Sequence, residues 1–276
     1  MKYANYSIFS TDFKEFGLDL AVKHTLEMGF NAVEHIENAM VDNAKLQSLS
    51  DALRMRKLLD ANGLTVSCYS VVLNLLAEDV AVQKERMLRH VEYARELGSP
   101  FVHHTLVPGY DREKKTMTLS EVLERIADDA ADIAKYCNVN GMMCLYEPQG
   151  LYFNGVDGVG AIIREMRSRG LKVGVCGDTG NSIYVDVDPV DIFRTFSRDI
   201  VHVHVKDYCY GRAEEARICS EGGKAISDSR FGEGDCHVKE CLAQLSDYSG
   251  DISFEFKDTD SEMARSIEWV KELMRK

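Results

Sequence analysis

The most constraining feature of this sequence is a recurring mark: an amphipathic stretch ends at a glycine, and a short run of β-forming residues follows at once. The mark occurs at Met28-Gly29, Asn62-Gly63, Leu97-Gly98, Asn140-Gly141, Arg169-Gly170 and Ser249-Gly250. A glycine after a helix adopts the left-handed conformation that closes the last turn. Each mark therefore predicts the end of a helix followed by a strand.

The stretches between these marks have helical periodicity. In 84–97 and 120–137, apolar residues recur at spacings of three and four, with charged residues between them. Further strands are expected near 3–9 and 200–206, which brings the strand candidates to eight. Helices are expected near 12–28, 48–62, 80–97, 119–138, 157–169, 189–197, 236–246 and 261–275.

Strands that alternate with helices pair in parallel, because a parallel connection needs a crossover of a dozen or more residues. Eight such units predict an α/β fold with one closed (β/α)8 TIM barrel, a single domain over residues 1–276. The length is close to the ~250 residues typical of that fold. An open doubly wound sheet is the alternative, but it usually has a glycine-rich turn after its first strand. Residues 9–13 read Phe-Ser-Thr-Asp-Phe, so the barrel is favoured.

Composition narrows the function. A net charge of −12 disfavours a nucleic-acid partner, because an acidic chain repels a phosphate backbone. The eight cysteines form no CxxC pair, which is typical of buried thiols in a reducing compartment. The sequence has no secretory apolar core and no run of 18 apolar residues, so we expect a cytoplasmic protein without a membrane segment.

Polar residues are expected inside the seventh strand of the barrel. Side chains alternate along a strand, which divides Val201, Val203 and Val205 from His202, His204 and Lys206. The valines suit the helix-facing side. Three polar groups facing the barrel axis would be costly to bury without partners, and they indicate a functional site more than a satisfied core.

Three other strands end in carboxylates. In the last strand Glu255 faces inward between outward phenylalanines, and it needs a metal or an ion pair with Lys206 or Lys257. Glu147 precedes the proline that ends the strand at 142–147, and Asp178 follows the strand at 171–177. Asp178 alone could equally be an ordinary turn or cap residue.

The carboxyl ends of barrel strands converge, so Glu147, Asp178, His204 and Glu255 are expected to meet. Three carboxylates and an imidazole would repel each other without a cation between them. Such oxygen-rich sites suit one divalent metal ion, Mn²⁺ first, with Mg²⁺, Co²⁺ or Zn²⁺ as alternatives.

Several motifs carry a family resemblance over essentially the whole chain. They are His202-Val-His204-Val-Lys206-Asp207, Glu147-Pro148, Gly177-Asp178-Thr-Gly-Asn181, Gly232-Glu233-Gly234-Asp235 and Phe254-Glu255-Phe256. Together they resemble the xylose isomerase-like barrels, which include sugar phosphate isomerases and epimerases, ketose 3-epimerases, inosose dehydratases and endonuclease IV repair enzymes.

The resemblance implies that Glu147, Asp178, His204 and Glu255 are the metal ligands and that Glu147 and Glu255 are the catalytic acid/base pair. Asn181 stands where ketose 3-epimerases have a substrate-contacting histidine, and Tyr210 stands where they have an arginine, with Arg212 two residues on. Asn181, Lys206 and Arg212 are expected to orient the substrate, and Glu34 matches a glutamate at the mouth of the second strand. His103 and His104 straddle the fourth strand end; alternation lets only one face inward, and His104 is included among the expected substrate contacts.

These residues predict a sugar or sugar phosphate isomerase/epimerase that acts by proton transfer through a metal-stabilised enediolate. An inosose or keto-sugar dehydratase is the alternative, and a non-catalytic sugar-binding barrel is a further one. Endonuclease IV is disfavoured because its metal cluster uses more histidines than the eight here could supply, two of them on predicted helices. The segment 207–235 is too long for an ordinary loop and is expected to form a lid, a rim or a contact in a homo-oligomer.

Overall fold

Eight parallel strands form a closed barrel in the computed structural model, which describes residues 1–6, 17–41, 44–211, 216, 218–255 and 260–275. Their order around the barrel is β1-β11-β7-β6-β5-β4-β3-β2, and every described ladder is parallel. The strands are β1 (Tyr3–Asn5), β2 (Ala32–Ile36), β3 (Thr65–Val71), β4 (Phe101–His104), β5 (Met143–Tyr146), β6 (Val173–Asp178), β7 (Ile200–Val205) and β11 (Asp251–Phe254). The predicted (β/α)8 TIM barrel is confirmed.

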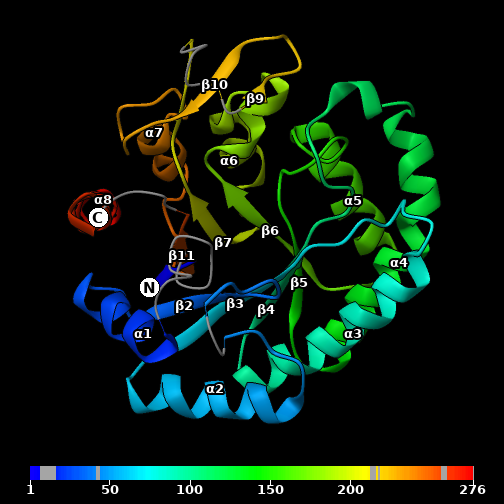
Figure 1. Cartoon of the computed structure of the whole chain (residues 1–276). Coiled ribbons are helices and arrows are strands. Elements are labelled where there is room, and N and C mark those ends of the chain that lie inside the picture. The colour runs from blue at the N-terminus through cyan, green and yellow to red at the C-terminus, as the bar shows by residue number, and fades with distance from the viewer. Residues whose placement is uncertain (7–16, 42–43, 212–215, 217, 256–259, 276) are drawn as a thin grey trace.

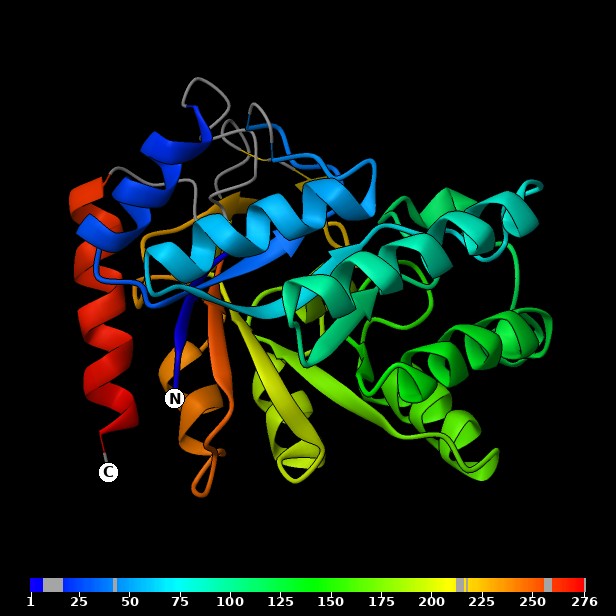
Figure 2. The same cartoon turned by 90° about the horizontal axis from the view of Figure 1, so that it is seen from below.

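The helices surround the strands as an outer ring (Figure 1), and Figure 2 shows the last helix on the same side of the barrel as the first. They are α1 (Leu18–Glu27), α2 (Leu49–Ala61), α3 (Val80–Leu97), α4 (Leu119–Val139), α5 (Val156–Ser168), α6 (Pro189–Phe196), α7 (Val238–Ala243) and α8 (Asp260–Met274). Local sequence sets their ends. Thr118 and Glu121 form a capping box at α4, and Gly98 ends α3 with φ 74°.

Five of the six glycine marks have positive φ: Gly29, Gly63, Gly98, Gly141 and Gly170. Gly250 does not, and its role is close approach instead. A Cβ there would lie 2.5 Å from the carbonyl oxygen of Val201 and 2.6 Å from the hydroxyl of Tyr248. A strand follows the mark at all six places, but at Gly250 no helix ends there, because α7 already ends at Ala243.

One side-chain direction in β7 was predicted wrongly. Along the β6–β7 ladder Val175 pairs with Ile200 and Cys176 with His202, so the register shifts by one residue at Val201. Val201 consequently packs against the small apolar cluster of Cys68, Leu145 and Cys176 instead of joining Val203 and Val205 in the main core. From His202 onward the alternation holds, and the shift preserves the inward column that ends in Lys206.

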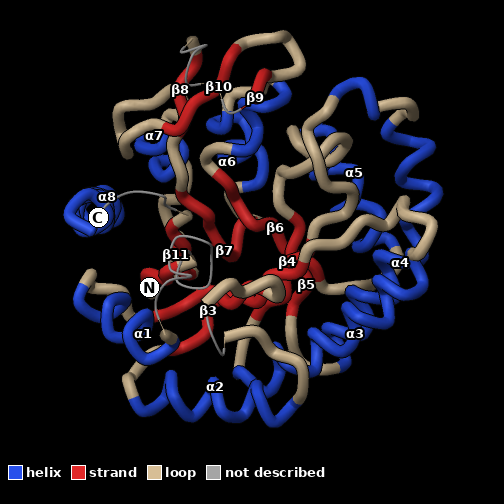
Figure 3. The backbone as a smooth tube through the Cα atoms, in the orientation of Figure 1, coloured by secondary structure: helices blue, strands red, loops and turns tan. Residues whose placement is uncertain are grey.

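The segment after β7 forms a small antiparallel sheet outside the barrel (Figure 3). Its strands are β8 (Tyr208–Tyr210), β9 (Ile218–Cys219) and β10 (Ala225–Asp228), in the order β8-β10-β9. The Tyr210 hydroxyl donates to the carbonyl of Ile183 at 3.1 Å, and the Glu221 amide donates to that of Tyr184 at 2.9 Å. We call the segment with β8, β9 and β10 the insertion. It lies against the short helix η4 (Asn181–Val185) that follows β6, as expected for a segment that forms a rim.

All eight cysteines lie in the described part of the chain, and all are free thiols. Six of them are buried, as predicted: Cys68, Cys137, Cys144, Cys176, Cys236 and Cys241. No helix among the described residues is long and apolar enough to cross a bilayer.

Candidate active site

Four side chains from adjacent barrel strands meet at one point. Glu147 follows β5, Asp178 ends β6, His204 lies near the end of β7, and Glu255 follows β11. Each offers one ligand atom, and the four atoms lie within 4.8 Å of one another. These strands are neighbours in the barrel, so parallel pairing brings together residues more than a hundred positions apart. We call these residues the acidic cluster.

Asp178 is fixed by the backbone of its own turn. Its Oδ1 accepts hydrogen bonds from the amides of Gly180 (2.8 Å) and Asn181 (2.5 Å). Its Oδ2 is buried without a hydrogen-bond partner among the described residues and lies 3.0 Å from Lys206 Nζ. Burial raises the pKa of Asp178 well above its ordinary value, although Lys206 lowers it. A further positive charge would stabilise the ionised form of a carboxylate in this position.

The ring of His204 connects the acidic cluster to a carboxylate beneath it. Nδ1 lies 2.8 Å from Glu147 Oε1 and 3.0 Å from Glu255 Oε1. Nε2 lies 3.0 Å from both carboxylate oxygens of Glu34. A histidine that presents one nitrogen to a metal commonly gives the other to a carboxylate, which fixes the orientation of its ring.

Glu34 was expected to contact substrate at the mouth of the barrel, but it is fully buried under His204. It also accepts from Ser70 Oγ at 2.5 Å and lies 2.9 Å from His202 Nε2. Burial by itself would raise the pKa of Glu34, but His204 and His202 lower it by more, so that the pKa is well below its ordinary value. In this position Glu34 supports the ring of His204.

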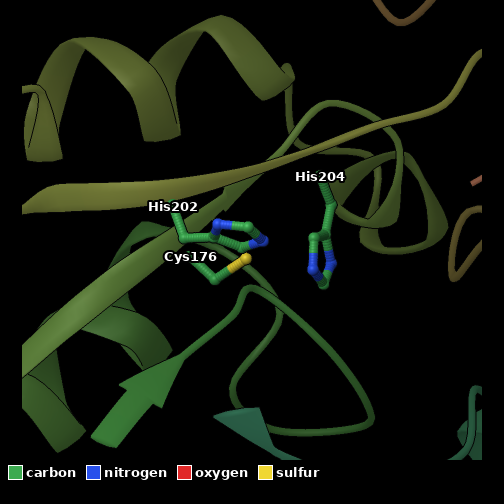
Figure 4. A group of neighbouring side chains, drawn as sticks. All are labelled: Cys176, His202 and His204. Carbon is green, nitrogen blue, oxygen red and sulfur yellow. The ribbon is translucent and has the colours of Figure 1, made fainter. Parts of the chain in front are cut away.

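The barrel interior below the acidic cluster also contains polar side chains, among them Cys176 and His202. Figure 4 shows the thiol of Cys176 and the ring of His202 close together and next to His204. The donor atoms of these three residues lie within 4.8 Å of one another. His202 Nε2, however, already lies 2.9 Å from Glu34 and 3.0 Å from Ser253 Oγ, both at hydrogen-bond distance. These contacts hold His202 in place below His204, where it supports the His204 ring.

Lys206 provides positive charge beside the acidic cluster. Its buried Nζ lies 2.6 Å from Glu255 Oε2 and 3.0 Å from Asp178 Oδ2. The ion pair considered for Glu255 in the sequence is therefore present, and Glu255 belongs to the acidic cluster at the same time. In this arrangement Lys206, which was expected to orient substrate, balances charge between two carboxylates.

The ambiguity between His103 and His104 is resolved in favour of His103. His103 Nδ1 lies 3.1 Å from Ser70 Oγ, and its Nε2 lies 3.2 Å from Glu147 Oε2. His104 points away: its Nδ1 lies 2.9 Å from the Thr105 carbonyl, and its ring packs on Tyr146. Alternation in β4 therefore places the ring of His104, which was expected to contact substrate, on the side of the strand away from the acidic cluster.

Asn181 lies beside the acidic cluster. Its backbone is bound to Asp178, and its Nδ2 is buried without a partner among the described residues. Tyr110, which no sequence motif singled out, donates to Asn181 Oδ1 at 3.4 Å, and its ring lies tilted against that of Tyr184 with the centroids 4.2 Å apart. Tyr6, also missed, meets the edge of His204 at 5.4 Å. Arg212, Phe256 and Lys257 lie outside the described residues.

The donor set fits a hard divalent ion. Three carboxylates and one imidazole on four converging strands match the ligands that Mn²⁺, Mg²⁺, Co²⁺ and Zn²⁺ accept. The Oδ2 atom of Asp178, which is buried and has no hydrogen-bond partner in the described part of the chain, and the ring of His204, which a carboxylate holds, are features that such an ion would use.

Several solved structures have the same fold. Those most similar include a probable 3-DHS dehydratase, AsbF, from Bacillus anthracis (16% identity, 98% of this chain and 99% of that chain, TM-score 0.75). Others are the IOLI protein with a binding zinc atom (14%, 99% and 98%, TM-score 0.75) and an L-ribulose 3-epimerase (17%, 99% and 94%, TM-score 0.74). At these identities the likeness establishes the fold alone. No curated protein sequence matches the chain.

The family profile for the xylose isomerase-like TIM barrel matches residues 22–273, which is nearly the whole chain. The closed parallel barrel and the likeness to solved barrels of that type agree with this match. The chain belongs to the xylose isomerase-like TIM barrel family.

Proposed function

We propose that this protein is a divalent-metal-dependent isomerase or epimerase that moves a proton beside the carbonyl of a sugar or sugar phosphate. The observation that carries the proposal is the acidic cluster, in which two glutamates flank one imidazole: Glu147 Oε1 at 2.8 Å and Glu255 Oε1 at 3.0 Å from His204 Nδ1. Both glutamates thus lie within reach of one small substrate held at the same point.

Glu147, Asp178, His204 and Glu255 would hold the ion, with Mn²⁺ as the first choice. When bound, the ion supplies Lewis-acid stabilisation of the negative charge that develops on the substrate oxygens. The structures of a magnesium complex and a zinc-containing protein among the similar barrels support a divalent metal at such a site.

Glu147 and Glu255 would divide the proton transfer between them, one removing the proton and the other returning it. A positioned general acid or base contributes ~10²–10⁴-fold to the rate. Their partners differ, since Glu147 Oε2 faces His103 at 3.2 Å whereas Glu255 Oε2 faces Lys206 at 2.6 Å. This asymmetry would give the two carboxylates different roles at one substrate carbon.

A dehydratase is the second candidate, and Lys206 is the observation that favours it. Its buried ammonium group lies beside Glu255 and would stabilise the negative charge that develops on a departing β-hydroxyl. The resemblance to a probable dehydratase is as strong as that to an epimerase, with TM-scores of 0.75 and 0.74.

The test is incubation of the Mn²⁺-loaded protein with ketoses, ketose phosphates and inososes in deuterated water, followed by mass and stereochemical analysis. An isomeric product that carries deuterium beside the carbonyl is expected, and its formation should be abolished by a chelator and by Glu147→Gln but not by Glu124→Gln. A product that has lost one water would establish the dehydratase instead. Ligand-dependent thermal stabilisation without turnover of any compound would overturn both and indicate a binding protein.

A further inference from the structure

Thr179 binds the backbone of Lys206 through its hydroxyl group. Thr179 is fully buried, and its Oγ1 donates to the carbonyl of Lys206 at 2.7 Å and accepts from the amide of Lys206 at 3.0 Å. The amide and the carbonyl of an extended residue point to the same side of its strand, so one hydroxyl can take the place of a paired residue on a neighbouring strand. The Thr179 amide also donates to the carbonyl of His204 at 3.1 Å. Thr179 thus extends the β6–β7 pairing beyond its last ladder pair, Asp178 with His204.

The residues on either side of Thr179 contact the side chain of Lys206. Gly180 leaves room for its aliphatic stem, because a Cβ on Gly180 would lie 2.5 Å from Cγ and 3.0 Å from Cδ of Lys206. The φ of Gly180 is −117°, a negative value open to other residues, so space and not backbone conformation favours glycine here. Asp178 contacts the end of the side chain, with Oδ2 3.0 Å from Nζ. Three consecutive residues therefore contact the ammonium group, the backbone and the stem of Lys206.

The position of the Lys206 ammonium group affects how Glu255 is held. Lys206 Nζ lies 2.6 Å from Glu255 Oε2, and the other carboxylate oxygen, Oε1, lies 3.0 Å from His204 Nδ1. If the ammonium group moved away, Glu255 would lose the partner of Oε2 and with it a restraint on the direction of its carboxylate. A lysine side chain has many rotamers, so holding its ammonium group in one place requires support along the whole residue.

A second threonine makes the same bonds at a place where no charge has to be positioned. Thr105 follows β4, and its Oγ1 donates to the carbonyl of Leu73 and accepts from the amide of Leu73 at 2.7 Å. Its own amide donates to the carbonyl of Val71 at 3.2 Å. Leu73 is buried and apolar. The bond pattern by itself therefore joins strand ends, and the buried ammonium group on the bound residue is what distinguishes Thr179.

We propose that Thr179 is a positioning residue for the reaction: its hydroxyl fixes the backbone of Lys206 and so keeps the ammonium group between Asp178 and Glu255. The effect on turnover rests on the proposed isomerase or epimerase function, whereas the placement of Lys206 does not. Loss of the Thr179 hydroxyl should act through Lys206, and it should therefore have little effect on turnover once the ammonium group has been removed.

The test is a double-mutant cycle of Thr179→Val and Lys206→Met. Valine keeps the shape of threonine without the hydroxyl, and Thr179→Ser keeps the hydroxyl. The control is the cycle of Thr105→Val with Lys206→Met, because it removes the same bonds from Leu73. Two quantities are measured: kcat and KM of the Mn²⁺-loaded enzyme with the best sugar of the substrate panel, and the unfolding equilibrium constant of the metal-free protein in denaturant. Circular dichroism verifies that each variant folds.

Thr179→Val is expected to lower kcat about tenfold with little change in KM, and Thr179→Ser should keep kcat close to that of the parent. In the Lys206→Met background, Thr179→Val should lower kcat by no more than about twofold. Likewise, Thr179→Val should raise the unfolding constant about tenfold more in the parent than in Lys206→Met, whereas the effect of Thr105→Val should be the same in both.

Equal effects of Thr179→Val in the parent and in Lys206→Met would overturn the positioning role and leave Thr179 as a link between strand ends. Absence of turnover by the parent would instead overturn the proposed function. In that case, or if Lys206→Met has no turnover, the unfolding constants alone decide whether Thr179 positions Lys206.

Discussion

Glu34 Oε1 and Oε2 both lie 3.0 Å from Nε2 of His204, which turns the other ring nitrogen toward Glu147 and Glu255. Glu34 lies on β2 and His204 on β7, across the barrel interior. A buried carboxylate thereby sets the orientation of the only imidazole in the acidic cluster.

Removing the Glu34 carboxylate, which holds the ring of His204, should weaken metal binding. Glu34→Gln is expected to lower Mn²⁺ affinity about 10–100-fold, because loss of a carboxylate behind a histidine ligand typically has that effect. Isothermal titration calorimetry would measure the change, with the exposed Glu124→Gln as control. An unchanged affinity in Glu34→Gln would show that His204 does not depend on Glu34.

Lys206 should contribute most to the unfolding free energy when no metal ion is bound. Lys206→Met leaves Asp178 and Glu255 without their cation, and breaking a buried pair costs about 3–5 kcal/mol of unfolding free energy. Added Mn²⁺ should restore much of this loss, because it would supply the missing charge. Lys224→Met, which breaks an exposed pair with Asp186, should cost no more than about 1 kcal/mol. Denaturant unfolding with and without Mn²⁺ measures both, and an equal loss in the two conditions would contradict the charge-balance role.

Acid should destabilise the protein through His35. Burial, with His90 as a smaller cause, lowers the pKa of His35 from its ordinary value to about 3. The unfolded ring takes up a proton near pH 6.5 and the folded ring does not, so stability is present above pH 6.5 and is lost as the pH falls toward 3. By pH 5 the loss from this ring is about 2 kcal/mol. His35→Phe removes the titrating group, and its unfolding free energy should fall less between pH 7.5 and pH 5. Equal pH dependence in both proteins would contradict this assignment.

Asp207 should anchor the end of the insertion. Its carboxylate accepts from the amides of Gly232 (2.8 Å), Gly234 (3.1 Å) and Cys236 (3.4 Å). Asp207→Ala is expected to speed amide hydrogen exchange in residues 229–236 and leave the barrel strands protected. The exposed Asp247→Ala is the control. Unchanged exchange in that segment would mean that the β8–β10 sheet holds it without Asp207.

The barrel could be predicted from the sequence because each crossover has its own local pattern: a periodic helix, a glycine and a β-rich run. The same regularity brought Glu147, Asp178, His204 and Glu255 together, since residues at the carboxyl ends of neighbouring parallel strands must meet.

The details that sequence could not supply depend on strand phase and on distant contacts. β4 is only four residues long, so alternation could not decide between His103 and His104. The register shift at Val201 has no local signal, because Ile and Val suit either face of a parallel strand. The contact of Glu34 with His204 joins residues 170 positions apart, so no local sequence pattern predicts it.

The acidic cluster is tested most directly by the number of Mn²⁺ ions bound per chain, measured by equilibrium dialysis for the parent protein and for Asp178→Asn. We expect one ion per parent chain, a large loss of binding in Asp178→Asn, and unchanged binding in Asp247→Asn. Absence of Mn²⁺ from the parent, or equal binding in parent and Asp178→Asn, would contradict the assignment of the acidic cluster as a metal centre.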